Sequence, residues 1–234
     1  MSRWPGQEFQ REKEQNGGSG TDSTRGMEII RLNPGDPPYP NALDKYLGDA
    51  APSSLSTLGN LELLKQHKLA LFCSATCPAP VTVQTHDLAY QLTHDRVVVI
   101  SGFHSPVERE CLAILLRGSQ PIIVCPARSL KKMRIRREWK KPLDDGRLLF
   151  LSPFADHRHR GDTAMALYRN RCVAALANKI FVAYAAPSSK TEQFCREIRA
   201  WETPLYTLES QCNVNIIQMK AKALKPNQTI ELTG

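Results

Sequence analysis

Short apolar runs alternate with longer mixed segments over most of this chain. Six of the runs are four or five residues long, and several are rich in β-branched or aromatic side chains. Continuous apolar runs are typical of strands buried on both faces, as in a parallel sheet. The predicted strands are Leu69–Cys73, Val97–Ile100, Ile122–Cys125, Leu148–Leu151, Ile180–Tyr184 and Leu205–Leu208.

Helical patterns fill the stretches between these runs. Ser105 before Pro106 is a good helix start, and Asp162 or Thr163 can cap a later helix in the same way. Strands that alternate with helices at this spacing predict an α/β fold with a doubly wound, mostly parallel sheet flanked by helices. The predicted helices are Val81–Thr93, Pro106–Arg117, Leu130–Lys140, Thr163–Ala177 and Lys190–Trp201.

The pattern divides the chain into four parts. Residues 1–26 are polar and rich in Gly and Ser, which predicts a disordered tail. Residues 27–67 form a proline-rich and then helical lead-in. The α/β domain follows over residues 68–209, and residues 210–234 form a C-terminal extension of weak β character or a tail.

Composition excludes several classes of protein. No apolar run approaches the ~18–20 residues that span a bilayer, and the first residues lack the apolar core of a secretory signal. The seven cysteines are odd in number and include no CxxC pair, as expected for buried thiols in a reducing compartment. We therefore expect a cytoplasmic protein with no membrane segment and no metal site.

The net charge of +8 is concentrated in one stretch of the chain. Residues 128–171 hold 13 Lys and Arg against 5 Asp and Glu, whereas the remainder is balanced. A localised basic stretch is typical of proteins that bind a phosphate backbone, although a solvated basic helix face is a common alternative. Eight of the cations lie between Arg128 and Lys141 around one acid, Glu138, and Lys131, Lys132 and Arg134 are candidate nucleic-acid contacts. Trp139 lies among them, either as a stacking platform for bases or as a core residue.

Small polar residues follow three of the predicted strands. In a doubly wound sheet, ligands bind beyond the carboxyl ends of the strands, where small residues let backbone N–H groups approach a phosphate. Ser and Gly are also common in such turns for purely structural reasons. The candidate contacts in these turns are Ser74, Ser101, Gly102, Ser189 and Lys190.

The predicted helix 163–177 carries the sequence Arg169-Asn170-Arg171 in its first half. Arginine has a planar fork of donors that suits phosphate oxygens and stacks on bases. With Asp162 the one acid close by in sequence, these three residues are candidate contacts at the edge of the crevice, and an ion-paired helix face is the alternative.

These residues carry a resemblance to the DNA-processing protein A (DprA/Smf) family, over about Asp36 to Leu208. The most specific match is Arg169-Asn170-Arg171 followed by Val173-Ala174-Ala175-Leu176, which is similar to the family's "RNRIIAGLS". Ser101-Gly102 resembles the family's "SG.A.GID" loop, and Phe150-Leu151-Ser152 resembles its "LLSE" strand end. A lead-in of the family type, "YP..L......P..L...G", is matched by Tyr39, Pro40, Leu43, Pro52, Leu55 and Gly59.

The resemblance implies an extended Rossmann-like fold that binds single-stranded DNA, forms a homodimer and helps to load a RecA-type recombinase, without cofactor or catalysis. The absence of both GxGxxG and a P-loop agrees with this. The sequence departs from the family where its "GSR" reads Cys73-Ser74-Ala75, where its "GID" reads Pro106-Val107-Glu108, and where the basic run replaces its "GLD..YP" loop. Cations of the basic run would then replace the missing arginine.

Three other functions compete with DNA binding. A nucleotide-binding sensor, or a regulatory partner of a toxin in a defence cassette, would explain the altered loops. A LOG-like nucleotide phosphoribohydrolase shares the sheet but needs a "PGG.GT..E" segment, which here reads 187–194 without the glycines and with Phe194 in place of the catalytic glutamate. No catalytic constellation stands out elsewhere, so we expect a binding protein rather than an enzyme.

Overall fold

The computed structural model describes residues 28–225 and Leu232. The predicted disordered tail over residues 1–26 lies outside these residues. Within them, nine strands form one sheet in the order β1-β2-β6-β5-β4-β3-β7-β8-β9. The strands are β1 (Ile30–Leu32), β2 (Leu55–Gly59), β3 (Lys68–Cys73), β4 (Val98–Ser101), β5 (Ile122–Val124), β6 (Leu148–Ser152), β7 (Lys179–Tyr184), β8 (Leu205–Leu208) and β9 (Lys222–Leu224).

The seven neighbouring strands β6, β5, β4, β3, β7, β8 and β9 run parallel to one another. β2 lies antiparallel to β6, and β1 lies antiparallel to β2. The α/β, doubly wound and mostly parallel fold is therefore confirmed. All six predicted strands are present, each within one residue of its predicted ends. The prediction succeeded because these strands are buried on both faces of the sheet, so their sequences are continuously apolar.

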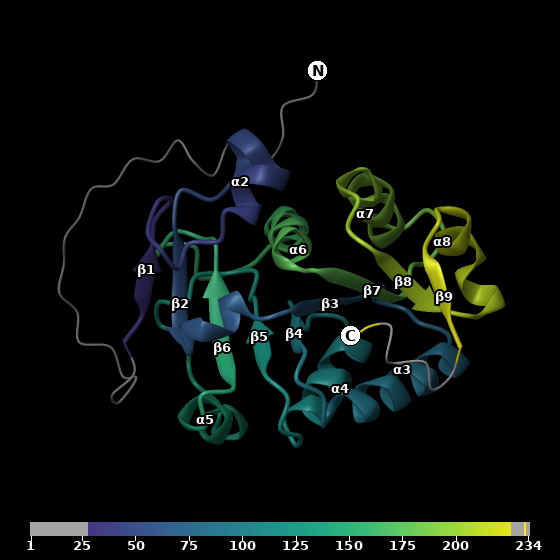
Figure 1. The fold of residues 1–234 in the computed structure, drawn as a ribbon, viewed down its shortest axis with the longest axis horizontal. Coiled ribbons are helices and arrows are strands. Elements are labelled where there is room, and N and C mark those ends of the chain that lie inside the picture. Colours follow the sequence, from purple (N-terminus) through teal and green to yellow (C-terminus); the bar gives the residue numbers. More distant parts are fainter. Residues whose placement is uncertain (1–27, 226–231, 233–234) are drawn as a thin grey trace.

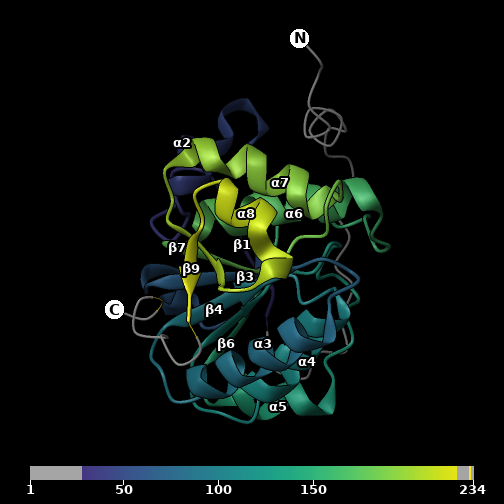
Figure 2. The ribbon, with the colours of Figure 1, turned by 90° about the vertical axis from the view of Figure 1, so that its right-hand side faces the viewer.

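Helices cover both faces of the sheet (Figures 1 and 2). On one face lie α3 (Ala79–Leu92), α4 (Pro106–Leu115) and α5 (Arg137–Asp144). The other face carries α2 (Ala42–Leu47), α6 (Thr163–Leu176), α7 (Lys190–Ile198) and the short α8 (Val214–Gln218). Successive strand residues point to opposite faces, so Phe72 packs in the layer under α6 and α7 while Leu71 packs in the layer under α3 and α4.

The lead-in over residues 27–67 contributes more than the expected helix, since it also supplies β1 and β2. The Tyr39 hydroxyl donates to the Pro52 carbonyl at 2.7 Å, which holds the start of α2 close to the chain that enters β2. Gly59 ends β2 with a φ of 118°, and a Cβ there would overlap the Leu148 carbonyl. These contacts give a physical role to three positions of the lead-in motif.

Two predictions outside the strands need correction. The helix predicted over Leu130–Lys140 begins only at Arg137, because Lys132 has a left-handed φ of 59° and the Ser129 hydroxyl accepts from the Lys131 N–H in a turn. The C-terminal extension is also more ordered than expected, since it contributes α8 and β9. The caps at Ser105 and Asp162 are confirmed, with side-chain acceptance from Glu108 N and Met165 N.

Candidate functional site

The carboxyl ends of β3 and β7 meet where the chain connections leave the sheet in opposite directions. The connection from β3 runs through α3 to β4 on one side, whereas β7 lies on the other side of β3 and is reached through α6. Such a switch point is the usual place for a ligand crevice in a doubly wound sheet. Ser74 and Ser189 meet there, with 3.4 Å between their hydroxyl oxygens, and Lys190 is exposed beside them.

The turn after β4 lies beside these turns at the same end of the sheet, because β4 pairs with β3. Ser101 is buried, and its hydroxyl accepts from the Phe103 N–H at 3.1 Å. A Cβ on Gly102 would overlap the guanidinium of Arg169. Gly102 is therefore required here because α6 places a large side chain directly against the turn.

Arg169 lies inward, which corrects the expectation that its guanidinium fork is presented at the rim. The residue is 3% exposed, Nη1 donates to the Cys125 carbonyl at 2.7 Å, and Nε donates to Asn170 Oδ1 at 2.8 Å. Burial lowers the pKa of Arg169, and the negative charge of Glu108 opposes that shift. The side chain thus ties α6 to the carboxyl ends of β4 and β5.

The other two members of the motif lie apart from each other. Arg171 forms a bidentate ion pair with Glu197 of α7, at 2.6 and 2.9 Å, so it joins two helices. Asn170 is half-buried beside Arg169, and its amide N–H₂ group makes no hydrogen bond to the described residues. Of the three, Asn170 is the one whose donors are available to a ligand.

Two buried glutamates occupy the turns that small residues had marked as phosphate sites. Glu108 accepts from the N–H groups of Cys73, His104 and Ser105 at 2.9, 2.7 and 3.1 Å. Its carboxylate therefore fills the position that an anion would take between β3 and β4. The prediction missed this role, although the spacing from Ser105 to Glu108 is the sequence signature of a capping box.

Glu192 plays the same part in the turn after β7. Its carboxylate accepts from the Ser188 N–H at 3.0 Å, from Asn215 Nδ2 at 2.6 Å and from Arg196 Nη2 at 2.9 Å. The hydrogen bond from Asn215 is the main reason that the pKa of Glu192 lies below its ordinary value. Phe194 packs edge-on against Phe72, with 4.9 Å between ring centroids. Neither residue offers the free carboxylate that a LOG-like phosphoribohydrolase needs in this segment.

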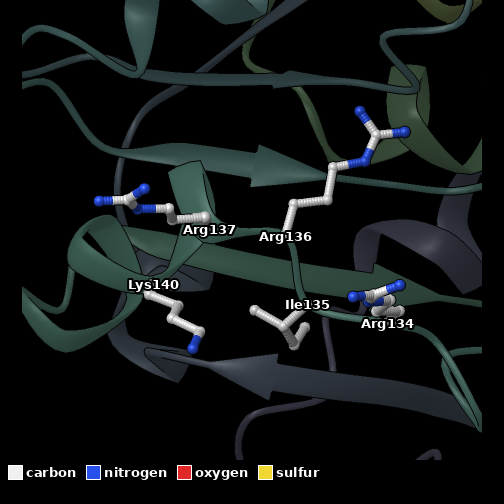
Figure 3. A pocket seen from close by; sticks show the side chains of 5 residues that line it. All are labelled: Arg134, Ile135, Arg136, Arg137 and Lys140. Atoms are coloured by element: carbon white, nitrogen blue, oxygen red, sulfur yellow. The ribbon is translucent and has the colours of Figure 1, made fainter.

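The basic segment, residues 128–141, lies beyond β5 and leads into α5. Its cations other than Arg128 are exposed. Ion pairs with carboxylates of the described residues involve Lys131, which lies 3.6 Å from Asp156, Arg136, which lies 3.8 Å from Glu138, and Lys141, which lies 2.9 Å from Asp145. A hollow of about 700 Å³ is lined by this segment alone (Figure 3). Its lining residues are Arg134, Ile135, Arg136, Arg137 and Lys140.

Contacts at both ends fix the basic segment to the sheet. At its start, the Ser152 hydroxyl donates to the Arg128 carbonyl at 2.8 Å, and the Ser129 N–H donates to the Arg158 carbonyl at 2.8 Å. Near its end, Trp139 packs on Phe150 with 5.0 Å between ring centroids, and the Arg136 guanidinium lies 5.0 Å from the Trp139 ring. Trp139 thus anchors the segment to β6, so the structure favours its packing role over base stacking.

No helix in residues 28–225 is both long and apolar enough to cross a bilayer. Over the same residues, no three His, Cys, Asp or Glu side chains are grouped in a way that could hold a metal ion.

Comparison with known proteins gives a consistent result. The family model described as DNA recombination-mediator protein A matches residues 31–233. The fold is similar to DNA processing protein A from Streptococcus pneumoniae, with a TM-score of 0.73 and 20% identity over 88% of this chain and 75% of that one. It is also similar to the Helicobacter pylori DNA processing protein A, described for its single-stranded DNA binding mode, with a TM-score of 0.69 and 21% identity over 89% of this chain and 94% of that one. Among curated proteins no significant sequence match is found.

Proposed function

The chain belongs to the DNA recombination-mediator protein A family, and from that premise we propose that it binds single-stranded DNA in DNA processing, without a catalytic step of its own. The observation that carries this proposal is the basic segment. Four exposed cations line one hollow beside the sheet, and the one ion pair among them that the described residues form is a loose contact of Arg136 with Glu138. Unneutralised cations on a fixed surface segment suit a phosphodiester backbone.

In this proposal the backbone lies along Lys131, Lys132, Arg134 and the following cations. Lys190, Asn170 and the hydroxyls of Ser74 and Ser189 offer polar contacts at the crevice. Ser101, Gly102 and Arg169 shape the crevice floor as positioning residues, and Arg171 holds α7 against α6. We also propose that cations of the basic segment take over the role of the arginine that the family motif has at the position of Ala75.

The test is a fluorescence anisotropy titration of the full chain with single- and double-stranded oligonucleotides at about 50 and about 200 mM salt. We expect a preference for the single strand and a fall in affinity of at least about tenfold between the two salt concentrations. Equal affinity at both concentrations, or a preference for the duplex, would contradict the proposal.

A matched pair of variants separates the basic segment from general positive charge. Replacing Arg134, Arg136, Arg137 and Lys140 by Gln removes four charges from the hollow. A control with Lys65, Arg96, Arg117 and Lys220 replaced by Gln removes four exposed charges elsewhere. The first variant should flatten the slope of log affinity against log salt by about 3 units, at ~0.7 per phosphate contact, whereas the control should keep most of the slope.

The resemblance also leads us to propose a homodimer and the delivery of DNA to a RecA-type recombinase; a toxin partner is the competing proposal. Light scattering of the pure protein, and strand exchange by a recombinase with and without it, are the corresponding measurements. If a toxin co-purifies with the chain and strand exchange is unaffected, the proposal of a toxin partner is favoured.

A further inference from the structure

A second hollow lies at the amino-terminal ends of the parallel strands, whereas the crevice lies at their carboxyl ends. Its volume is about 450 Å³, within the range of ligand sites. Lys68, the first residue of β3, lines it, whereas the crevice lies beyond Cys73 at the other end of the same strand. Segments far apart in the sequence form its walls, namely residues 40–46, the C-terminal end of α6 at 175–178, and residues 202–204 before β8.

Lys68 brings a buried positive charge to this hollow. The residue is 8% exposed, and its ammonium donates to the carbonyls of Leu64 and Gln66 at 2.9 and 2.6 Å. No carboxylate of the described residues lies within ion-pair distance of it, and burial lowers the pKa of Lys68. A buried cation held by carbonyls alone costs free energy, which an incoming anion offsets.

Thr203 is a second, independent sign of a ligand. Thr203 is one of the residues that line the same hollow, and its Oγ1 is shielded from solvent and makes no hydrogen bond to the described residues. Buried hydroxyls are nearly always hydrogen-bonded, so an unused one on a residue beside a hollow points to a missing partner. Lys45 adds an exposed cation, and Glu202 is an exposed carboxylate in the same lining.

The remaining wall is mixed, since Asn41 and Asn178 line it together with aromatic and aliphatic side chains. Tyr46 stacks on Trp201 with 5.2 Å between ring centroids, and the Lys45 ammonium lies 4.9 Å from the centre of the Tyr46 ring. Leu176 and Ala177 at the end of α6 are buried. A bare phosphate ion would leave most of this volume and surface uncovered. An organic body beside the acidic group would cover this mixed wall and could bond the two asparagines.

We propose that this hollow binds a small organic anion, with its acidic group on Lys68 and Thr203 and its organic body beside Tyr46 and the two asparagines. Nucleoside monophosphates and aromatic carboxylates share this chemistry. Glu202 opposes a polyanion at the same place, so the hollow is separate from the proposed DNA contacts. The proposal does not depend on DNA binding.

The test uses the full chain with Arg134, Arg136, Arg137 and Lys140 replaced by Gln, so that the basic segment does not contribute. Adenosine 5′-monophosphate and benzoate are titrated by calorimetry, each beside its uncharged counterpart, adenosine or benzyl alcohol. At least one anion should bind at a single site with a Kd below about 1 mM, and about tenfold or more tighter than its counterpart. Binding of neither anion, or equal binding of the uncharged molecules, would overturn the proposal.

Three further substitutions locate the binding. K68M should lower the affinity for the anion by about tenfold or more, and T203V should lower it by about threefold to tenfold. K65M should leave the affinity unchanged, because Lys65 pairs with Glu62 outside the hollow. Circular dichroism shows whether each variant is folded. If K68M is unfolded, T203V decides, and unaltered affinity in T203V then overturns the assignment.

Discussion

Gly102 and Arg169 form a matched pair, since one has no side chain where the other places its guanidinium. The arginine also lies near Glu108, whose carboxylate bonds three backbone N–H groups. Packing of the buried Arg169 beside the buried Glu108, rather than a phosphate contact, is therefore the reason that Gly102 and Arg169 fit each other.

Gly102→Ala should destabilise the fold by about 1–3 kcal/mol, because the added methyl group forces Arg169 out of its place. Urea denaturation of G102A, R169A and the double variant measures the coupling. The loss in the double variant should be smaller than the sum of the two single losses, since removing Arg169 makes room for the methyl group. Strict additivity would show that the two residues do not compete for the same space.

The surroundings of the Cys77 thiol favour its thiolate form. A hydrogen bond from the Cys73 thiol, with a smaller contribution from Thr82, brings the pKa of Cys77 to about 7, against the opposing effect of burial. The thiolate fraction therefore rises as the pH increases through about 7. Alkylation by iodoacetamide, followed at Cys77 by mass spectrometry, should accelerate over this range. In C73A the acceleration should move to higher pH, and an unchanged profile would rule out the Cys73 hydrogen bond as the cause.

At the level of elements, the crevice is built from two similar strand–turn–helix units. In each, a serine caps the helix and a glutamate three residues later accepts from backbone N–H groups nearby. Ser105 and Glu108 do so at α4, where Glu108 accepts from three N–H groups, and Ser189 and Glu192 do so at α7, where Glu192 accepts from one. Capping of this kind fixes the turn in one conformation. The turns after β4 and β7 are thus rigid before any ligand binds.

Glu192 makes the stability of α7 depend on pH. Its folded pKa lies below the ordinary value of 4.5, so the stabilisation is complete above that pH and is lost as the pH falls through the folded pKa. E192Q should therefore be less stable than the parent at pH 7, and the difference should shrink in acid. Urea midpoints between pH 7 and pH 3 measure this, with the exposed Glu202→Gln as control. A difference that is constant with pH would contradict the assignment.

For the whole molecule, the sheet continues past the predicted end of the domain at residue 209. β9 pairs with β8, and the fully buried Asn213 donates to the carbonyls of Ala183 and Leu208 at 3.0 and 3.2 Å. Residues 210–225 therefore belong to the folded unit.

Truncation after residue 209 should lower the free energy of unfolding by several kcal/mol, because it exposes the edge of β8 and leaves buried carbonyls without donors; each such group costs ~1–3 kcal/mol. Thermal unfolding and the soluble yield measure the loss. A truncated chain as stable and as soluble as the parent would restore the predicted boundary at residue 209.

The fold was predictable from the sequence where both faces of a strand are buried, because six apolar runs stood out. β2 was missed because Ser56 and Thr57 interrupt its apolar pattern even though both are buried. β9 was expected only as weak β character within residues 210–234, because two of its three residues are exposed. The positive charge of the basic segment was visible in composition alone. The inward direction of Arg169 was not, because it depends on how α6 crosses the ends of β4 and β5, and no local pattern encodes that crossing.

The glutamates that cap the crevice turns have a consequence for what can bind there. Glu108 and Glu192 are covalently tethered next to the N–H groups that they occupy, so their effective concentration is far above that of any free solute. A mononucleotide arriving alone would have to displace one of them with a single phosphate. A long strand already retained at the basic segment faces no such competition, because its attachment does not require those N–H groups. The crevice should therefore discriminate by polymer length, admitting a chain and rejecting its monomers.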